Sequence, residues 1–324
     1  MQRFPLLNTL IAAWALSLAD VPLSTTAAAG DSAAKVVLAT ATQGGGFQLF
    51  GQNLAEVINA TDPGLAVEAI ATRGSRQNLS LLEEGKVDIG LVEGNAAREA
   101  LDGIRRQRAD LKILSVMYPN AGMFVVRANS AYRSIDDLRG QPVAFGTRAS
   151  GLRILANDVL DGLGLSPERD FRQIILEKAA AGPRLVLEGQ AEALWGAGIG
   201  WPGFVKVTNG PSGARFIAPS SAEVDRILAA HPHLRRMSVP AGTYRGQDLQ
   251  IDSVGLWSLI LVRRDLSEEL VHRLARAIHL GEAALVQRLD QGRYTTARNT
   301  AGEVPPDRLH PGVERYLREQ GLLH

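Results

Sequence analysis

The sequence predicts an α/β protein made of two α/β lobes, joined by a hinge and separated by a ligand cleft. From residue 30 onward, short runs rich in β-branched residues alternate with helical patterns. This alternation is typical of parallel sheets that are covered by helices. The length of 324 residues allows two domains of ordinary size. A third observation, a repeat of two glycine markers, indicates that the lobes are similar.

The glycine markers keep almost the same spacing in both halves of the chain. Gly46 and Gly151 are 105 residues apart, and Gly85 and Gly189, each in a Glu-Gly turn, are 104 residues apart. One strand–helix unit is therefore predicted twice. Chance is the alternative, because Glu-Gly turns are common after helices.

Ten strands are predicted where β-branched and apolar residues cluster between turn residues. They are 35–40, 65–71, 87–92, 113–118, 123–127, 142–145, 171–176, 192–195, 215–217 and 253–262. Nine helices are predicted after glycine, proline or capping residues, such as the serines that precede acidic first turns. They follow Gly46, Ser75, Asn95, Ser134, Gly151, Ala181, Ser220, Ser267 and Pro311.

The chain is expected to cross between the lobes near 118–124 and again near 234–242, and each region contains a turn-rich segment. These segments are 118–122 and 239–242, each with proline and glycine. The predicted first lobe comprises residues 30–122 and 240–324, and the predicted second lobe comprises residues 123–239.

Residues 1–29 are predicted to be a signal peptide. A single basic residue, Arg3, precedes a mostly apolar stretch, and Ala27 and Ala29 occupy the positions of a small-residue cleavage site. Cleavage near Ala29 would deliver the protein to the periplasm. A disordered tail or a membrane anchor is the alternative.

The composition excludes several classes of protein. The net charge is +1 without a basic stripe, so nucleic-acid binding has no electrostatic basis. The chain has no cysteine, so disulfides, thiolate metal sites and a lipid-anchored cysteine are excluded. We expect a monomer.

Three Gly/Ser turns each lie between an apolar run and a helical pattern. They are Gly44-Gly45-Gly46, Thr72-Arg73-Gly74-Ser75 and Thr147-Arg148-Ala149-Ser150-Gly151. The start of a helix presents unpaired N–H groups and the positive end of the helix dipole, which together favour anions. The turns therefore predict capture of a small organic anion.

Catalytic, cofactor and metal motifs are weak by comparison. The chain has no Gly-x-Ser-x-Gly nucleophile motif and no phosphate-binding loop. His231-Pro232-His233 lacks further ligands at metal-site spacing. We therefore expect no cofactor, no metal and no enzymatic activity.

The predicted ligand site combines hydrogen-bond donors, charges and aromatic walls. Ser75, Ser150 and neighbouring N–H groups would bind a carboxylate, and Arg148 would add a bidentate contact, although a solvated arginine is an equal alternative. Trp195 is expected in the core more than in the site. The complete set is Gly45, Gly46, Phe47, Arg73, Gly74, Ser75, Asn78, Glu93, Tyr118, Arg148, Ala149, Ser150, Gly151 and Trp201.

The ordered motifs resemble the TAXI family of solute receptors, which serve TRAP (tripartite ATP-independent periplasmic) transporters. The matching residues are 44–47 with Gly51, 72–75 with Asn78, Gly85 with 88–92, 137–140 with Val143, 150–151 with Leu160 and Gly164, and 240–244 with 246–247. The chain departs from the family pattern at Phe47, Arg73, Arg148-Ala149 and Glu192. The two arginines are expected to alter the choice of ligand.

The resemblance implies a type II periplasmic-binding-protein fold that closes on a small carboxylate. It also implies delivery of an amino-acid-like or carboxylate ligand, similar to glutamate or a 2-oxo acid, to the membrane subunits of a TRAP permease. A ligand-sensing subunit for a sensor kinase is one alternative. An enzyme on the same two-lobed scaffold is another, because a fold does not determine a function.

Overall fold

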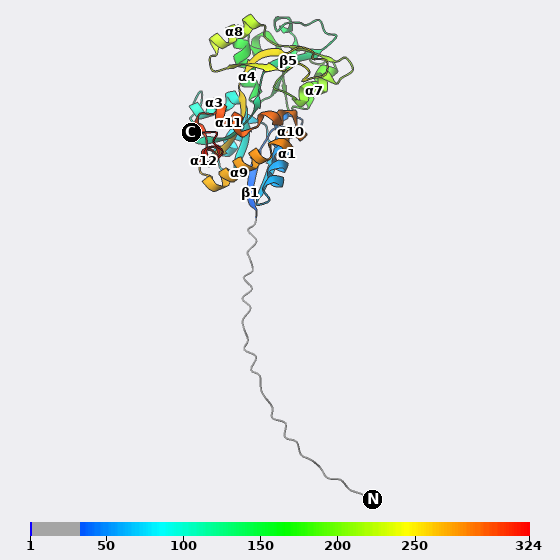
Figure 1. The fold of residues 1–324 in the computed structure, drawn as a ribbon. Helices are drawn as coiled ribbons and strands as arrows, with labels where there is room; N and C mark the ends of the chain where they lie inside the picture. Colours follow the sequence, from blue (N-terminus) through cyan, green and yellow to red (C-terminus); the bar gives the residue numbers. More distant parts are fainter. Residues whose placement is uncertain (2–32) are drawn as a thin grey trace. The chain divides into compact units, whose positions relative to one another are not determined.

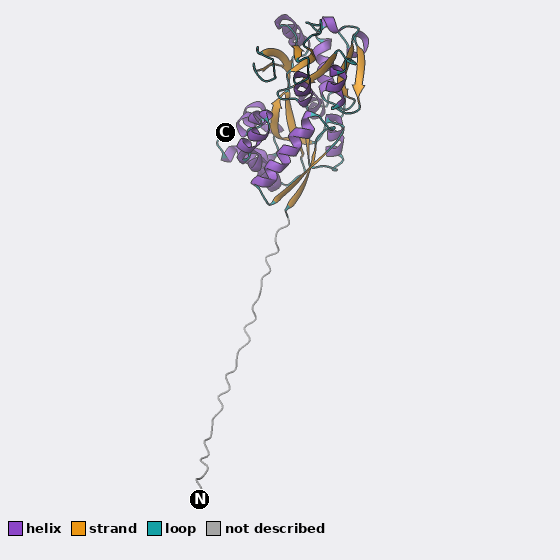
Figure 2. Cartoon of the chain, turned by 90° about the vertical axis from the view of Figure 1, so that its right-hand side faces the viewer, coloured by secondary structure: helices purple, strands orange, loops and turns teal. Residues whose placement is uncertain are grey.

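The computed structural model describes Met1 and residues 33–324. Apart from Met1, the predicted signal peptide, residues 1–29, and its cleavage site lie outside the described residues. Residues 33–324 form one compact unit whose strands are flanked by helices (Figures 1 and 2). Within the described residues, no helix combines the length and apolar character needed to cross a membrane.

The first lobe is built on a five-stranded sheet in the order β2-β1-β3-β12-β4. Its strands are β1 (Ala34–Ala39), β2 (Leu65–Ile70), β3 (Ile89–Val92), β4 (Leu111–Pro119) and β12 (Trp257–Arg263). β1 is parallel to β2 and β3, whereas β12 is antiparallel to β3 and β4.

The second lobe repeats this arrangement in the order β7-β6-β8-β5-β9. Its strands are β5 (Gly122–Arg127), β6 (Pro142–Thr147), β7 (Arg172–Leu176), β8 (Ala193–Ala197) and β9 (Ala214–Ile217). β6 is parallel to β7 and β8, and β5 is antiparallel to β8 and β9. The two sheets therefore have the same order and the same pattern of strand directions.

The repeated glycines end equivalent helices in the two lobes. Gly85 and Gly189 follow α2 (Ser75–Glu83) and α6 (Ala181–Leu187), with φ of 66° and 76°. Glycine adopts this left-handed conformation without the steric penalty of a Cβ. Each turn then leads into the third parallel strand of its sheet.

The antiparallel strands β5 and β12 each follow a point where the chain crosses from one lobe to the other. The chain leaves the first lobe between β4 and β5, at residues 119–122. It returns between β11 (Ile251–Gly255) and β12. This is later than the return expected near 234–242: that segment holds β10 (Arg235–Val239), which pairs antiparallel with β11, and Met237, Val239 and Tyr244 lie in a buried cluster of the second lobe.

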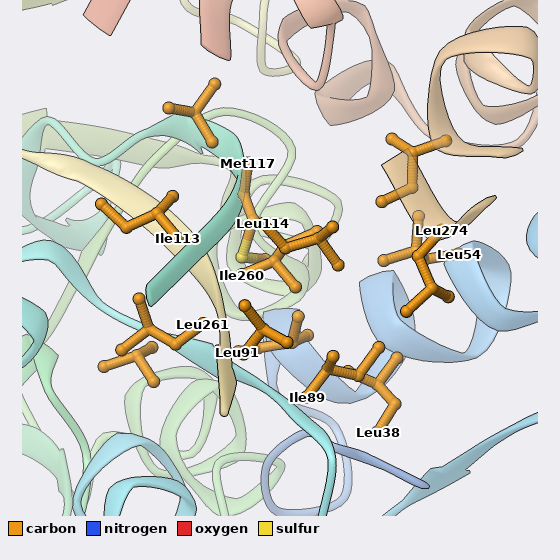
Figure 3. Close-up of a cluster of buried hydrophobic side chains, with 14 of the residues drawn as sticks. Leu38, Leu54, Ile89, Leu91, Ile113, Leu114, Met117, Ile260, Leu261 and Leu274 are labelled. Atoms are coloured by element: carbon orange, nitrogen blue, oxygen red, sulfur yellow. The ribbon is translucent and has the colours of Figure 1, made fainter. Parts of the chain in front are cut away.

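Helices complete the core of the first lobe. They are α1 (Gly46–Thr61), α2, α3 (Gly94–Asp102), α9 (Glu268–Leu280), α10 (Glu282–Arg288), α11 (Ala297–Glu303) and α12 (Pro311–Glu319). Figure 3 shows Leu54 of α1 and Leu274 of α9 among side chains from the central strands, such as Leu38, Ile89 and Ile260. All five are fully buried. Removing such apolar surface from water is the main stabilising contribution to the fold.

The second lobe has shorter helices around an aromatic core. They are α4 (Leu152–Asp161), α5 (Pro167–Asp170), α6, α7 (Pro202–Thr208) and α8 (Ser221–Ala230). Phe124 contacts Trp195 with ring centroids 4.8 Å apart and Phe145 at 5.9 Å, both edge-on. This geometry is the one that aromatic quadrupoles favour.

Several predicted elements differ from the structure. Residues 253–262 form two strands, because the chain changes lobes at Leu256. The helix predicted after Ser134 is a single 3₁₀ turn, Asp136–Leu138. β10, α5, α7, α10 and α11 were not predicted; α7 begins directly after Trp201.

Candidate functional site

A cavity lies where the three predicted Gly/Ser turns meet. Its volume is about 70 Å³. The helix N-caps Gly45 (α1), Gly74 (α2) and Gly151 (α4) all line it. Two of these helices belong to the first lobe and one to the second, so both lobes build the walls.

Direct hydrogen bonds join the lobes around the cavity. The backbone N–H of Arg76 donates to the carbonyl of Ala149 at 3.2 Å. The N–H of Ala179 donates to Oγ1 of Thr42 at 3.1 Å, and Oγ1 of Thr147 donates to the carbonyl of Arg73 at 3.4 Å. These contacts close the walls of the cavity from two sides.

Two glycines allow the lobes to approach one another closely. A Cβ on Gly151 would lie 2.5 Å from Cβ of Glu93 and 2.8 Å from Oγ of Ser75. A Cβ on Gly46 would lie 2.9 Å from the indole of Trp201. Real Cβ atoms do not approach other atoms this closely, so larger residues here would hold the lobes apart.

Glu93 is the buried acid of the cavity. Its side chain caps α3, with Oε2 accepting from the N–H of Asn95 at 3.0 Å and of Ala96 at 3.4 Å. Burial nevertheless raises its pKa from 4.5 to about 8, against the opposing effect of these hydrogen bonds. Glu93 is therefore both a helix cap and a cavity group that is mostly protonated at pH 7.

Several donors in the cavity wall have no protein acceptor. Oγ of Ser75 accepts the N–H of Glu93 at 3.1 Å, so its own proton is available. Among residues 33–324, no hydrogen bond uses the hydroxyl of Tyr118 or the backbone N–H of Gly46, Phe47 or Ser75. The N–H groups begin α1 and α2, where the helix dipole is positive.

Aromatic side chains make the remaining walls. Phe47 and Tyr118 meet edge-on at 6.4 Å, and Trp201, the N-cap of α7, lies edge-on to Phe204 at 4.9 Å. Trp195, expected in the core, is 1% exposed, yet it also lines the cavity. Its Nε1 donates to the carbonyl of Leu152 at 2.8 Å. A ligand here would contact apolar surface as well as donors.

Arginines gather at the edge of the cavity. Arg73 lines it with an exposed side chain. Burial, followed by the charges of Arg76 and Arg148, lowers the pKa of Arg153, while Glu168 acts in the opposite direction. These guanidinium groups are therefore close enough to form a positive field beside the cavity.

Three predicted site residues do not line the cavity: Asn78, Arg148 and Ala149. Asn78 is fully buried, and its Nδ2 donates to the carbonyls of Thr40 and Leu91, both at 2.7 Å. Arg148 has an exposed side chain. Ala149 contributes its carbonyl to the contact with Arg76.

The other predicted residues line the cavity: Gly45, Gly46, Phe47, Arg73, Gly74, Ser75, Glu93, Tyr118, Ser150, Gly151 and Trp201. Their roles toward a ligand remain predictions. Lining residues that the sequence reasoning missed are Ala41, Thr42, Asn120, Phe145, Gly146, Thr147, Leu152, Leu176, Ala179, Trp195 and Ala197. Six of these eleven residues lie within the third turn or within three residues of the first or third turn, so a wider window around each turn would have found them.

The cavity itself offers few metal ligands. Among its lining residues, Glu93 is the only one of the His, Cys, Asp and Glu types. Within residues 33–324, one group of such side chains could hold a metal ion: Asp158, His231 and His233 of the second lobe. It shares no residue with the cavity lining.

Comparison with known proteins agrees with this architecture. The model of the NMT1-like family matches residues 38–321. A solved structure from Bordetella bronchiseptica RB50 is 13% identical over 90% of this chain and 99% of its own, with a TM-score of 0.57. A proposed L-cystine ABC transporter protein from Listeria monocytogenes is 14% identical over 81% and 98%, with a TM-score of 0.52. The fold is the two-lobed α/β fold of periplasmic binding proteins.

Proposed function

The chain belongs to the NMT1-like family, and we propose that it is an exported solute-binding protein that delivers a small organic anion to a membrane transporter. The observation that carries the proposal is the cavity between the lobes, with three helix N-termini in its walls. The proposal includes no chemical change of the ligand. Of the transporter classes, we propose a TRAP permease, on the strength of the motifs shared with TAXI receptors.

Among organic anions, we propose an amino acid or a related carboxylate. The free N–H groups of α1 and α2 and the Ser75 hydroxyl are suited to the carboxylate. The carboxyl group of Glu93 would accept a hydrogen bond from a ligand ammonium, which would also favour its ionised form. The small volume and the aromatic walls favour a short ligand with an apolar portion.

The arginines beside the cavity would attract the ligand first, and the groups inside the cavity would then bind it. Arg73, Arg76, Arg148 and Arg153 would raise the local concentration of anions. The ligand would then bind groups from both lobes, so its affinity for the closed arrangement would exceed that for an open one. Only this differential affinity allows a ligand to stabilise closure.

Thermal shift and titration calorimetry test the proposal, with a panel of amino acids and the 2-oxo acids of matching side chain. A ligand at a hundred times its Kd stabilises the folded protein by about 2.7 kcal/mol. We expect at least one such acid to bind at a one-to-one ratio. Failure of the whole panel to bind would contradict the ligand class, and binding of neutral solutes alone would contradict the role of the helix N-termini.

The Glu93→Gln variant tests the amine contact separately. We expect it to weaken binding of an amino acid at least tenfold while changing binding of the matching 2-oxo acid much less. Equal losses for both ligands would show that Glu93 supports the site only as a helix cap.

Sequencing the N-terminus of the exported protein tests the predicted cleavage near Ala29.

A further inference from the structure

The carboxyl-terminal half of α4 faces the loop that joins α8 to β10. Asp158 and Asp161 lie one turn apart on α4, on the same face of the helix. His231 ends α8, and His233 precedes β10. The sequence showed the His-Pro-His segment but not these partners, which lie 70 or more positions away.

The side chains converge on one point. Oδ2 of Asp158 lies 3.1 Å from Nε2 of His233, and its Oδ1 lies 3.9 Å from Nδ1 of His231. One ligand atom from each of the three residues lies within 4.8 Å of the others. Ligand atoms around a tetrahedral zinc ion are about 3.3 Å apart, given bonds of 2.0–2.1 Å. Small side-chain rotations would therefore complete the geometry.

A fourth group holds one of the ligands in place. Nε2 of His231 lies 3.0 Å from Oδ2 of Asp161. If Nδ1 binds a metal, Nε2 carries the proton and donates to this carboxylate. Such a carboxylate–histidine pair fixes the tautomer and orientation of a metal-bound imidazole. A simple ion pair between Asp158 and His233 would not require this arrangement.

From this geometry we infer that Asp158, His231 and His233 bind a divalent transition-metal ion, with Asp161 as the outer partner of His231. Two imidazoles and one carboxylate suit Zn²⁺, Co²⁺, Ni²⁺ or Cu²⁺ and disfavour Mg²⁺ and Ca²⁺. Three protein ligands leave one position for water. The side chains are 7% to 17% exposed, so the ion would be reachable but shielded.

The charges around the site permit a cation. Asp158 and Asp161 supply two negative charges beside two imidazoles. The positive charge of Arg98, on α3 of the first lobe, reaches His233, and Arg98 itself lies 3.9 Å from Asp102. The ion would join α4 to the 231–233 loop. Because α4 begins at the ligand cavity, the ion would also support one wall of the proposed anion site.

Equilibrium dialysis of the full chain against ZnCl₂, after EDTA treatment and without a histidine tag, tests the inference. We expect one zinc per chain, bound at about micromolar concentration or below. Asp158→Asn and His233→Asn should each weaken binding at least tenfold, and Asp161→Asn less. His272→Asn is the matched control, since His272 hydrogen-bonds Glu319 at 2.7 Å outside the group of Asp158, His231 and His233, and it should leave zinc binding unchanged.

Two further measurements use the unaltered protein. Co²⁺ should give the visible absorption of a four-coordinate site, and zinc should protect His231 and His233 from diethylpyrocarbonate while His272 still reacts. Absence of zinc binding at about 100 μM, or binding that survives Asp158→Asn and His233→Asn, would overturn the inference. Neither result would depend on whether an organic anion binds the cavity.

Discussion

Glu93 makes a quantitative prediction about stability and pH. Its carboxyl group has a pKa of 4.5 in the unfolded chain and about 8 in the folded protein. Between these values the folded state binds more protons than the unfolded state, so the free energy of unfolding falls as pH rises. The effect begins above the unfolded pKa and is complete once pH exceeds the folded pKa.

The magnitude follows from the two pKa values. A full difference of this size corresponds to about 5 kcal/mol at 1.36 kcal/mol per pKa unit, and about 3–4 kcal/mol of it falls between pH 5 and pH 8. Glu93→Gln keeps the size of the side chain and an oxygen that can cap α3, but it removes the charge. We expect the variant to lose this component of the pH dependence.

Urea denaturation at several pH values between 5 and 8 provides the assay, with the wild-type and variant curves subtracted. The subtraction removes contributions from other titrating groups. The wild-type protein should lose stability relative to Glu93→Gln as pH rises. A flat difference curve would show that the Glu93 carboxyl titrates normally, which would refute the idea of a desolvated acid in the cavity.

Three other variants test separate parts of the site. Gly151→Ala adds a methyl group 2.5 Å from Cβ of Glu93, so we expect calorimetry to show at least a tenfold loss of ligand affinity and X-ray scattering to show a larger radius of gyration. An unchanged affinity would mean that the lobes need not approach so closely. Arg73→Ala should weaken anion binding by about threefold to tenfold, while Arg148→Ala, at a residue that does not line the cavity, should change the affinity less than about twofold. A larger loss for Arg148→Ala than for Arg73→Ala would show that Arg148 contacts the ligand. Asn78→Ala leaves buried carbonyls without their donor and should lower the free energy of unfolding, measured by urea denaturation, by about 2–3 kcal/mol. Asn53→Ala is the control, because the Asn53 side chain makes its hydrogen bond, to the carbonyl of Leu49, at an exposed position. Similar losses for the two variants would contradict a structural role for Asn78.

The sequence was most informative where local chemistry determines local structure. Gly85 and Gly189 end helices because the chain needs a left-handed residue there, and the Gly/Ser turns located the starts of α1 and α2, whose N-caps are Gly45 and Gly74. The repeat of these markers predicted two equivalent halves, and the two sheets have matching strand orders. Seven of the eleven predicted residues that line the cavity lie on the three Gly/Ser turns.

Tertiary contacts determined the parts that could not be predicted. Residues 253–262 read as one strand because both pieces are apolar; only pairing with different sheets separates them. Trp195 packs in the core and also lines the cavity, whereas its place at the end of a predicted buried strand predicts only the position in the core. Asp158 comes close to the His-Pro-His segment because α4 packs beside the α8–β10 loop, so the partners of the histidines depended on the fold.

The two crossings between lobes lie side by side, and this has a mechanical consequence. The N–H of Asn120 donates to the carbonyl of Leu256 at 3.0 Å, and a Cβ on Gly255 would lie 1.7 Å from the carbonyl oxygen of Asn120. We expect the lobes to rotate about a single axis through this pair, as in hinge closure. Spin-label distances across the lobes would test this, since a sliding motion would change all of them equally.

Under such a rotation, displacement grows with distance from the axis. Tyr118 and Asn120, at the crossing, would keep nearly the same place in the open and closed forms. Arg73 and Ser150 belong to loops of opposite lobes, so the rotation would change the distance between them. The part of a ligand that contacts Tyr118 would then stay in place in both the open and the closed form. Contacts with the loops that move would stabilise the closed form.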